Sequence, residues 1–186
     1  MPALALSLVL CDNKASLEGG GQGGFMTAIY SIGHSNHETA AFIGLLRQHG
    51  VTLLADVRSQ PYSRYVPQFN RESLAPTLEA QGIAYRHLGG ALGGRPPGDE
   101  FLLADDSVDY DKLRDSEGFR QGLDELIALA RDQPTVLMCS EGNHRDCHRH
   151  LLITPALLDQ AVTVLHIQPD GTLVNAADEP RQLTLF

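Results

Sequence analysis

Residues 27–57 decide the fold class, and they read TAIYSIGHSNHETAAFIGLLRQHGVTLLADV. Residues 27–33 are apolar, β-branched or aromatic and end at a glycine, which is typical of a buried strand. Residues 51–57 repeat this pattern. Between them, apolar residues at helical spacing predict a helix over about 36–49. The stretch is therefore predicted to be a β-α-β unit.

The alternation of strands and helices continues along the chain. The first helix is expected to begin with a capping box formed by Ser35 and Glu38 and to stop at Gly50. Further predicted elements are a short helix before Gly82, a strand over 83–88, a helix capped by Ser116, a strand over 134–139, a helix over 147–159 and a strand over 162–167. The predicted fold class is α/β, a single three-layer domain with a mainly parallel sheet and helices on both faces.

Length and composition agree with one domain. The chain has 186 residues, of which 42% are hydrophobic, and this is enough for one core and short for two. No apolar run is long enough to span a bilayer, and the apolar start lacks the positive residues of a secretory signal, so we expect a cytoplasmic protein with no membrane partner. We expect residues 1–25 to be a disordered, glycine-rich extension, residues 26–167 to be the domain and residues 168–186 to be a C-terminal tail.

The net charge and the cysteines restrict the possible functions. A net charge of -9 opposes wholesale binding to phosphate backbones, although residues 58–95 are locally basic. Cys11, Cys139 and Cys147 are an odd number in a chain with no export signal. Free thiols are therefore expected rather than a disulfide framework.

Reactive side chains follow several of the predicted strands. In open α/β sheets, ligands bind outside the carboxyl ends of the strands. His34 follows the first strand, Asp56 and Arg58 follow the second, and Cys139 ends the fourth. If these strands are neighbours, an imidazole, a carboxylate, a guanidinium and a thiol meet in one crevice.

Residues 139–149, which read CSEGNHRDCHR, are the richest in reactive groups. A cysteine between a strand end and a helix N-terminus, with cations close in sequence, is expected to have a lowered pKa. We therefore predict an enzyme in which Cys139 is a nucleophile or a redox thiol. The candidate catalytic residues are Cys139, Glu141, Cys147 and His148.

Three other interpretations of this segment stay open. In the first, Cys139 and Cys147 are buried packing residues and the charged residues form a salt-bridged turn. This alternative is reasonable because free cysteine is among the most buried residue types. The four candidate residues are also ligand types that zinc accepts, but a spacing of eight between the cysteines matches no common zinc finger, so no metal and no cofactor is assigned. Finally, Cys139 and Arg145 have the spacing of a tyrosine-phosphatase loop.

Six motifs follow one another between residues 27 and 167. They are SIGHS at 31–35, DVRSQP at 56–61, GIAYRHLGG at 82–90, LGG at 92–94, MCSE at 138–141 and CHR at 147–149. In order and spacing they resemble the bacterial and archaeal family catalogued as domain of unknown function 488. The resemblance implies an α/β domain in which the matching residues belong to one site, without an established reaction. It also implies that Arg145 stands at a variable position, which weakens the phosphatase-loop interpretation.

Arginines and aromatic rings alternate after the second strand. Residues 58–71 combine Arg64 and other arginines with tyrosine and phenylalanine, as proteins that hold single-stranded nucleic acid do. The alternative is a proline-anchored loop with its rings in the core. A glycine run before Arg95 would let the backbone approach a phosphate or would simply turn the chain. The candidate substrate-binding residues are His34, Asp56, Arg58, Arg64, Arg95, Arg145 and Arg149.

The last five residues, QLTLF at 182–186, resemble the peptide by which bacterial repair and replication proteins bind the sliding clamp. The usual third residue is serine or aspartate, and Thr184 replaces it. The expected clamp-binding residues are Gln182, Leu183, Leu185 and Phe186. The alternative is a terminal strand that packs on the chain's own domain.

Together these patterns predict a cysteine-centred enzyme that acts on nucleic acid or nucleotides and is recruited by the sliding clamp. One alternative is a phosphatase or thiol-redox enzyme with a small substrate. The other is a non-catalytic module that binds nucleic acid or a protein.

Overall fold

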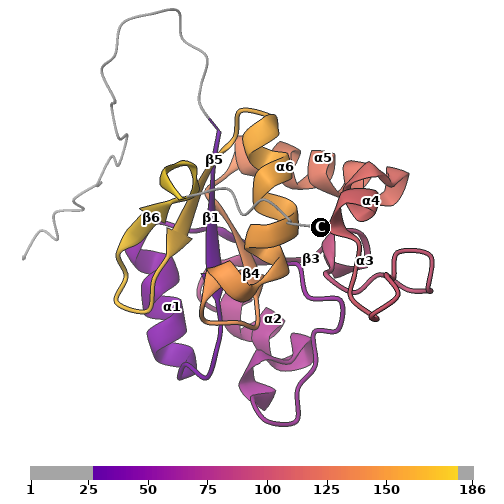
Figure 1. The fold of residues 1–186 in the computed structure, drawn as a ribbon. Coiled ribbons are helices and arrows are strands. Elements are labelled where there is room, and N and C mark those ends of the chain that lie inside the picture. The colour runs from indigo at the N-terminus through magenta and orange to yellow at the C-terminus, as the bar shows by residue number, and fades with distance from the viewer. Residues whose placement is uncertain (1–26, 180–186) are drawn as a thin grey trace, which may run out of the picture.

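The structure, a computed structural model, describes residues 27–179 and contains one six-stranded sheet (Figure 1). The strand order is β3-β2-β4-β1-β5-β6, and all neighbours are parallel except β5 and β6. The strands are β1 (Ala28–Gly33), β2 (Leu53–Asp56), β3 (Ala84–His87), β4 (Thr135–Cys139), β5 (Thr163–Ile167) and β6 (Leu173–Asn175). The predictions for residues 1–25, for Cys11 and for the peptide at 182–186 lie outside the described residues.

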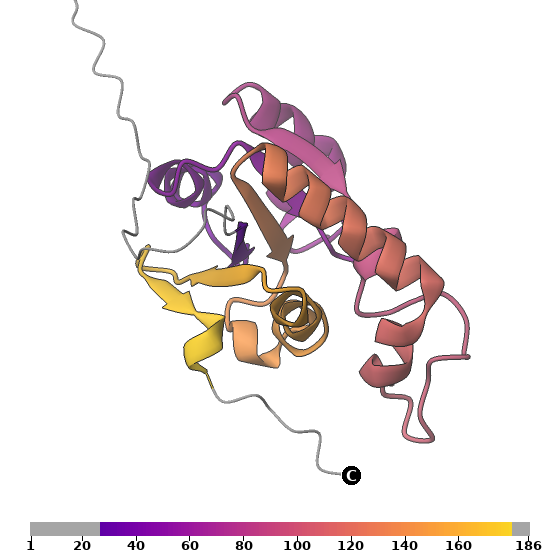
Figure 2. The same cartoon turned by 90° about the horizontal axis from the view of Figure 1, so that it is seen from above.

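Helices cover both faces of the sheet, as Figure 2 shows. One face carries α1 (Thr39–Gln48), η1 (Pro67–Phe69) and α2 (Arg71–Glu79), and the other carries α3 (Gly89–Leu92), α4 (Tyr110–Asp115), α5 (Glu117–Asp132), η3 (Arg149–Ile153) and α6 (Thr154–Asp159). The short helices η2 (His144–Asp146) and η4 (Ala176–Asp178) complete the described part of the chain. The predicted three-layer α/β domain is confirmed. Between residues 27 and 179, no helix is both long and apolar enough to cross a membrane.

The sheet separates two apolar cores, and β4 contributes to both. Val136 and Met138 enter the core beneath α1 and α2. Leu137 and Cys139 enter the core beneath α5 and α6. Successive side chains of a strand point to opposite faces of the sheet, and both faces of β4 are buried. The Cys139 side chain therefore lies on the α5 side of the sheet.

The predicted start of the first helix is wrong. Its N-cap is Glu38, whose side chain makes no capping hydrogen bond, and Ser35 has a φ of 45°. The amide of Ser35 donates to the carbonyl oxygen of Ser140 (2.8 Å), so this residue is bound to the loop after β4 instead of capping α1. At α5 the predicted cap is present, because the Ser116 hydroxyl accepts a hydrogen bond from the amide of Phe119.

Two other features differ from the predicted element boundaries. The helix predicted over 147–159 consists of η3, which is π-helical, followed by α6. β6 lies in the segment predicted to be a tail, and its antiparallel pairing with β5 extends the sheet beyond Ile167. A π-helical turn is often found at functional sites, and this one follows directly on Cys147 and His148.

Three strand ends lie side by side because β4 runs between β1 and β2. In the register of the sheet, Gly33 is opposite Cys139 and Asp56 is opposite Met138. The amide of His34 donates to the carbonyl oxygen of Cys139 (2.9 Å). The fold therefore brings the residues after β1, β2 and β4 to one edge of the sheet.

Candidate active site

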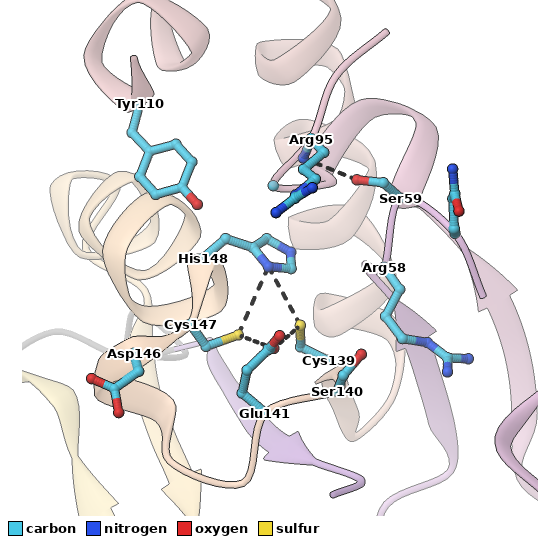
Figure 3. A pocket seen from close by; sticks show the side chains of 12 residues that line it. Arg58, Ser59, Arg95, Tyr110, Cys139, Ser140, Glu141, Asp146, Cys147 and His148 are labelled. Atoms are coloured by element: carbon cyan, nitrogen blue, oxygen red, sulfur yellow. Dashed lines mark hydrogen bonds between the residues drawn. The ribbon is translucent and has the colours of Figure 1, made fainter. Parts of the chain in front are cut away.

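Two thiols, one carboxylate and one imidazole meet at the carboxyl end of β4 (Figure 3). Glu141 Oε2 accepts hydrogen bonds from the Sγ atoms of Cys139 (2.8 Å) and Cys147 (3.1 Å). His148 Nδ1 lies 3.4 Å from the first sulfur and 3.8 Å from the second. His148 Nε2 lies 3.0 Å from the carbonyl oxygen of Val57 and must donate to it, since a carbonyl only accepts. Nδ1 therefore faces both sulfurs, as an acceptor in the neutral ring and as a donor in the protonated ring.

These four side chains lie at one side of a pocket of about 450 Å³. Its volume is in the range of small-molecule sites. Figure 3 shows Arg95 and Tyr110 across the pocket from the sulfurs, with Ser59 beside Arg95. Both cysteines are buried, whereas Glu141 and Arg95 are exposed. The pocket is thus a polar cavity with thiols at its base and an arginine at its entrance.

Two glycines permit the close packing around this group. A β-carbon at Gly33 would lie 1.8 Å from the carbonyl oxygen of Glu141. A β-carbon at Gly94 would lie 2.7 Å from both Cβ and Cγ of His148. The first glycine lets the loop after β4 close against β1, and the second lets the loop after α3 lie against the imidazole.

A buried guanidinium lies beneath the loop that carries Glu141. Arg149 is 1% exposed, and it donates to the carbonyl oxygens of Glu141 (2.6 Å) and Gly142 (3.2 Å). Its Nε has no hydrogen-bond partner within residues 27–179, where no ion pair of this side chain is found either. A buried cation without a carboxylate partner favours negative charge on the groups around it.

The two thiols differ in acidity. The hydrogen bond from Cys139, with His148 and Arg149 nearby, lowers the pKa of Cys147 to about 6. The hydrogen bond to Cys147, burial and the neighbouring Glu141 raise the pKa of Cys139. The predicted lowering of the pKa is therefore found at Cys147 instead of Cys139. Both thiols contact Glu141, and the hydrogen bond between the two sulfurs favours the thiolate on Cys147.

Glu141 remains ionised beside the thiols. Burial acts to raise its pKa, but the hydrogen bonds from Cys139 and Cys147 outweigh this effect and lower it. The group therefore combines a carboxylate, an imidazole nitrogen and a thiol whose pKa is lowered.

His34, Asp56 and Arg58 form a separate buried network. The Arg58 guanidinium pairs with Asp56 (2.6 Å) and donates to His34 Nε2 (3.1 Å) and to the carbonyl oxygen of Phe69 (2.8 Å). The Tyr85 hydroxyl donates to Asp56 (2.6 Å). Arg58 also lines the pocket, but Figure 3 shows its guanidinium directed away from the sulfurs. This network holds the loops after β1 and β2 in place.

Two of the predicted substrate-binding arginines contact groups outside the pocket. Arg64 donates to the Tyr65 hydroxyl (2.6 Å) and lies over the same ring. Arg145 pairs with Glu179 (2.7 Å), so its guanidinium is held at Glu179 and not at Cys139 as in a phosphatase loop. Tyr62 and Tyr65 are 71% and 78% exposed. The alternative in which the rings of this loop lie in the core therefore holds for Phe69, which is fully buried, and is wrong for Tyr62 and Tyr65.

The pocket gathers six of the residues named from the sequence: Arg58, Arg95, Cys139, Glu141, Cys147 and His148. Ser59 also lines the pocket and belongs to the motif at 56–61, whereas Tyr110 lines it from outside all six motifs. Tyr110 arrives from α4, which lies in an acidic stretch with no pattern that connects it to the site. The glycine run before Arg95 is the sequence feature that indicates this part of the pocket, because the close approach of the backbone to His148 requires a glycine at position 94.

A comparison with protein families assigns the chain to a family. The family model described as "Domain of unknown function DUF488" matches residues 38–154. This range contains all four side chains that meet at the end of β4. No curated protein and no solved structure matches the chain.

Proposed function

Since the chain belongs to the DUF488 family, we propose its function from the site itself, because the family's description names no reaction. The proposed function is that of a cysteine-centred enzyme acting on nucleic acid or nucleotides. One observation carries the proposal. Two thiols share one carboxylate oxygen and one imidazole nitrogen at the base of a polar pocket. A nucleophile within reach of a base, and a base oriented by a third group, is the usual arrangement for covalent catalysis.

The proposed nucleophile is Cys147. Its thiol proton passes to Glu141 Oε2 or to His148 Nδ1, and the sulfur forms a bond to an electrophilic atom of the substrate. The leaving group departs with the proton held by Glu141 or His148, and water then releases the product and regenerates the thiol. Val57 orients the imidazole through Nε2, and Arg149 stabilises the negative charge on the sulfur.

The choice of substrate rests on the surface next to the pocket. Arg58, Ser59 and Gln60 line the pocket, and the same loop continues to the exposed rings of Tyr62 and Tyr65. Exposed rings beside an arginine are a stacking platform for unpaired bases. Arg95 at the pocket entrance would bind a phosphate. A nucleotide in the pocket with neighbouring bases on the tyrosines is the arrangement that this surface favours.

Recruitment by the sliding clamp is part of the proposal. It rests on the sequence of Gln182–Phe186, because these residues lie outside the described part of the chain. The apolar residues would enter a groove on the clamp, and the glutamine would make orienting hydrogen bonds.

The test of the enzyme proposal combines thiol labelling with substrate screening. Iodoacetamide at neutral pH should modify Cys147 before Cys139, and this labelling should abolish turnover of single-stranded DNA, RNA or nucleotides. Cys147→Ser should be inactive, whereas Cys11→Ser serves as the matched control and should keep full activity. Labelling of Cys11 alone would contradict a reactive centre at Cys147. Turnover only of small phosphate esters or disulfides would favour the alternative small-substrate enzyme.

A second candidate function is a metal centre formed by the same side chains. One donor atom from each of Cys139, Glu141, Cys147 and His148 lies within 4.8 Å of all the others. The bond from His148 Nε2 to a backbone carbonyl is the outer contact that metal-bound histidines usually make. Metal analysis of purified protein separates the two candidates. Zinc that is lost in Cys139→Ser would favour a metal centre over a free thiol nucleophile at this site.

A further inference from the structure

Three imidazoles and a carboxylate form a second cluster, separate from the four side chains of the pocket. Their donor atoms are His144 Nε2, His150 Nδ1, His166 Nε2 and Glu179 Oε2, which all lie within 4.8 Å of one another. The four residues come from η2, η3, β5 and the segment just after η4. Segments that are distant along the chain therefore bring four ligand-type atoms to one point.

The distances within this histidine cluster are those of a small coordination shell. His144 Nε2 lies 2.8 Å from Glu179 Oε2, and His150 Nδ1 lies 3.1 Å from His166 Nε2. Glu179 Oε2 lies 3.8 Å from His166 Nε2 and 3.9 Å from His150 Nδ1. Ligands about 2.0–2.2 Å from a tetrahedral zinc ion lie roughly 3.3 Å apart, which is within the observed range.

The outward-facing atoms of two of these residues are already bound. His166 Nδ1 lies 2.6 Å from the Ser31 hydroxyl. Glu179 Oε1 accepts hydrogen bonds from Arg145 Nε and Nη2 (2.8 and 2.7 Å). These contacts direct His166 Nε2 and Glu179 Oε2 toward the centre of the cluster. Metal ligands are commonly oriented by such outer hydrogen bonds.

The cluster is shielded from water. His166 is 1% exposed, and the side chains of His144 and Glu179 are each 6% exposed. The rings of His144 and His166 are stacked with centroids 4.1 Å apart, an arrangement that two protonated imidazoles would oppose by like-charge repulsion. Neutral imidazole is the form that binds metals.

We propose that His144, His150, His166 and Glu179 bind a divalent transition metal ion, with zinc as the first choice. Three imidazoles and one carboxylate suit zinc, and four protein ligands in a buried position are typical of a structural site rather than a catalytic one. Cys147 and His148 lie between two of the ligands in the sequence. The metal would therefore fix the backbone that carries the reactive thiol, and it would attach the segment after η4 to β5.

The experiment uses the full chain with both pocket cysteines replaced, Cys139→Ser/Cys147→Ser, so that the pocket thiols contribute no metal binding. The metal-stripped protein is titrated with zinc, and bound zinc is counted by elemental mass spectrometry. One equivalent is expected, with a rise in Tm of about 5–10 °C at a zinc concentration near 100 times Kd. Adding Glu179→Gln or His144→Gln should weaken zinc binding more than about 100-fold, since even outer contacts are worth 10–100-fold. His37→Gln is the matched control and should bind zinc normally.

Cobalt absorption of the unmodified chain provides a second measurement if the double serine variant does not fold. Cobalt in the histidine cluster should show its visible absorption bands without the charge-transfer absorption that thiolate ligands produce. Glu179→Gln should remove these visible bands. A folded double serine variant that binds no zinc would overturn the proposal. Zinc or cobalt binding that is unchanged in Glu179→Gln and His144→Gln would overturn it as well. Neither outcome bears on the nucleophile proposal, which depends on Cys147 labelling.

Discussion

Gly94 packs directly on the imidazole of His148, at a position where a β-carbon would lie 2.7 Å from Cβ and Cγ and 3.1 Å from Nδ1 of the ring. The bond to Val57 holds the other edge of the same ring. The loop after α3 thus determines where the lone pair of His148 points, although Gly94 has no reactive side chain itself.

Gly94→Ala should displace His148 while leaving the fold intact. The added methyl group requires a shift of the imidazole or of the loop, and overpacking of this kind costs about 1–3 kcal/mol. The expected result is a changed ring resonance of His148 in NMR spectra and slower labelling of Cys147. Gly90→Ala is the matched control, because a β-carbon at Gly90 meets nothing within 4 Å. Identical His148 resonances in Gly94→Ala and the parent chain would show that the loop does not position the ring.

Stability should decrease in mild acid because of His34. Burial lowers the pKa of His34 to about 4, whereas the unfolded side chain has a pKa of about 6.5. Below pH 6.5 the unfolded chain therefore binds a proton that the folded chain does not, so the stability present above this pH is lost as the pH falls toward 4. The contribution of His34 amounts to about 2 kcal/mol between pH 7 and pH 5. Urea unfolding at both pH values should show a smaller loss in His34→Gln, and equal losses would contradict the assignment.

The buried pair of Asp56 and Arg58 should matter far more for stability than an exposed pair. Asp56→Asn leaves the Arg58 guanidinium buried without its carboxylate, which should cost about 3–5 kcal/mol. The matched control is Glu125→Gln, which breaks the exposed pair with Arg86 and should cost no more than about 1 kcal/mol. Denaturant titrations of both variants measure the difference. Similar small losses would mean that the network around Arg58 does not hold the loops.

Binding of single-stranded nucleic acid should depend on Tyr62 and Tyr65. Each stacked base contributes about 1–3 kcal/mol, so each alanine substitution should weaken binding about 5–150-fold. Fluorescence anisotropy with a labelled oligonucleotide at fixed salt measures the effect. Leu103→Ala, which alters another exposed apolar side chain, should bind normally. Equal affinities for all three variants and the unmodified chain would remove the stacking surface from the proposal.

Deletion of residues 182–186 should abolish binding to a bacterial sliding clamp and leave Tm nearly unchanged. A linear recognition peptide contributes contacts only to its partner. A terminal strand packed on the domain would behave in the opposite way, with a lower Tm and no clamp binding to lose. Calorimetry of the intact and shortened chains with purified clamp distinguishes the two results.

The strand ends were predictable from the sequence, but the contacts that distinguish the two thiols were not. Buried strands have apolar runs, and the carboxyl ends of parallel strands share one edge, so Cys139 could be placed near the site. The lowered pKa of Cys147 depends first on its hydrogen bond with Cys139 and then on His148 and Arg149, and no spacing in the sequence encodes these contacts. The segment containing β6 and Glu179 was assigned to a tail because three residues of strand give almost no periodic signal.

The position of β4 in the sheet has a consequence for how the chain becomes folded. β1 and β2 do not pair with each other, because β4 lies between them, and Ile29 is separated from its partner Thr135 by 106 residues. Pairings at such separations are slow to form. A nascent chain that ends before Thr135 can complete neither of the two cores, since both include side chains of β4. The strand that delivers Cys139 must therefore be synthesised before β1 and β2 can be joined in one sheet.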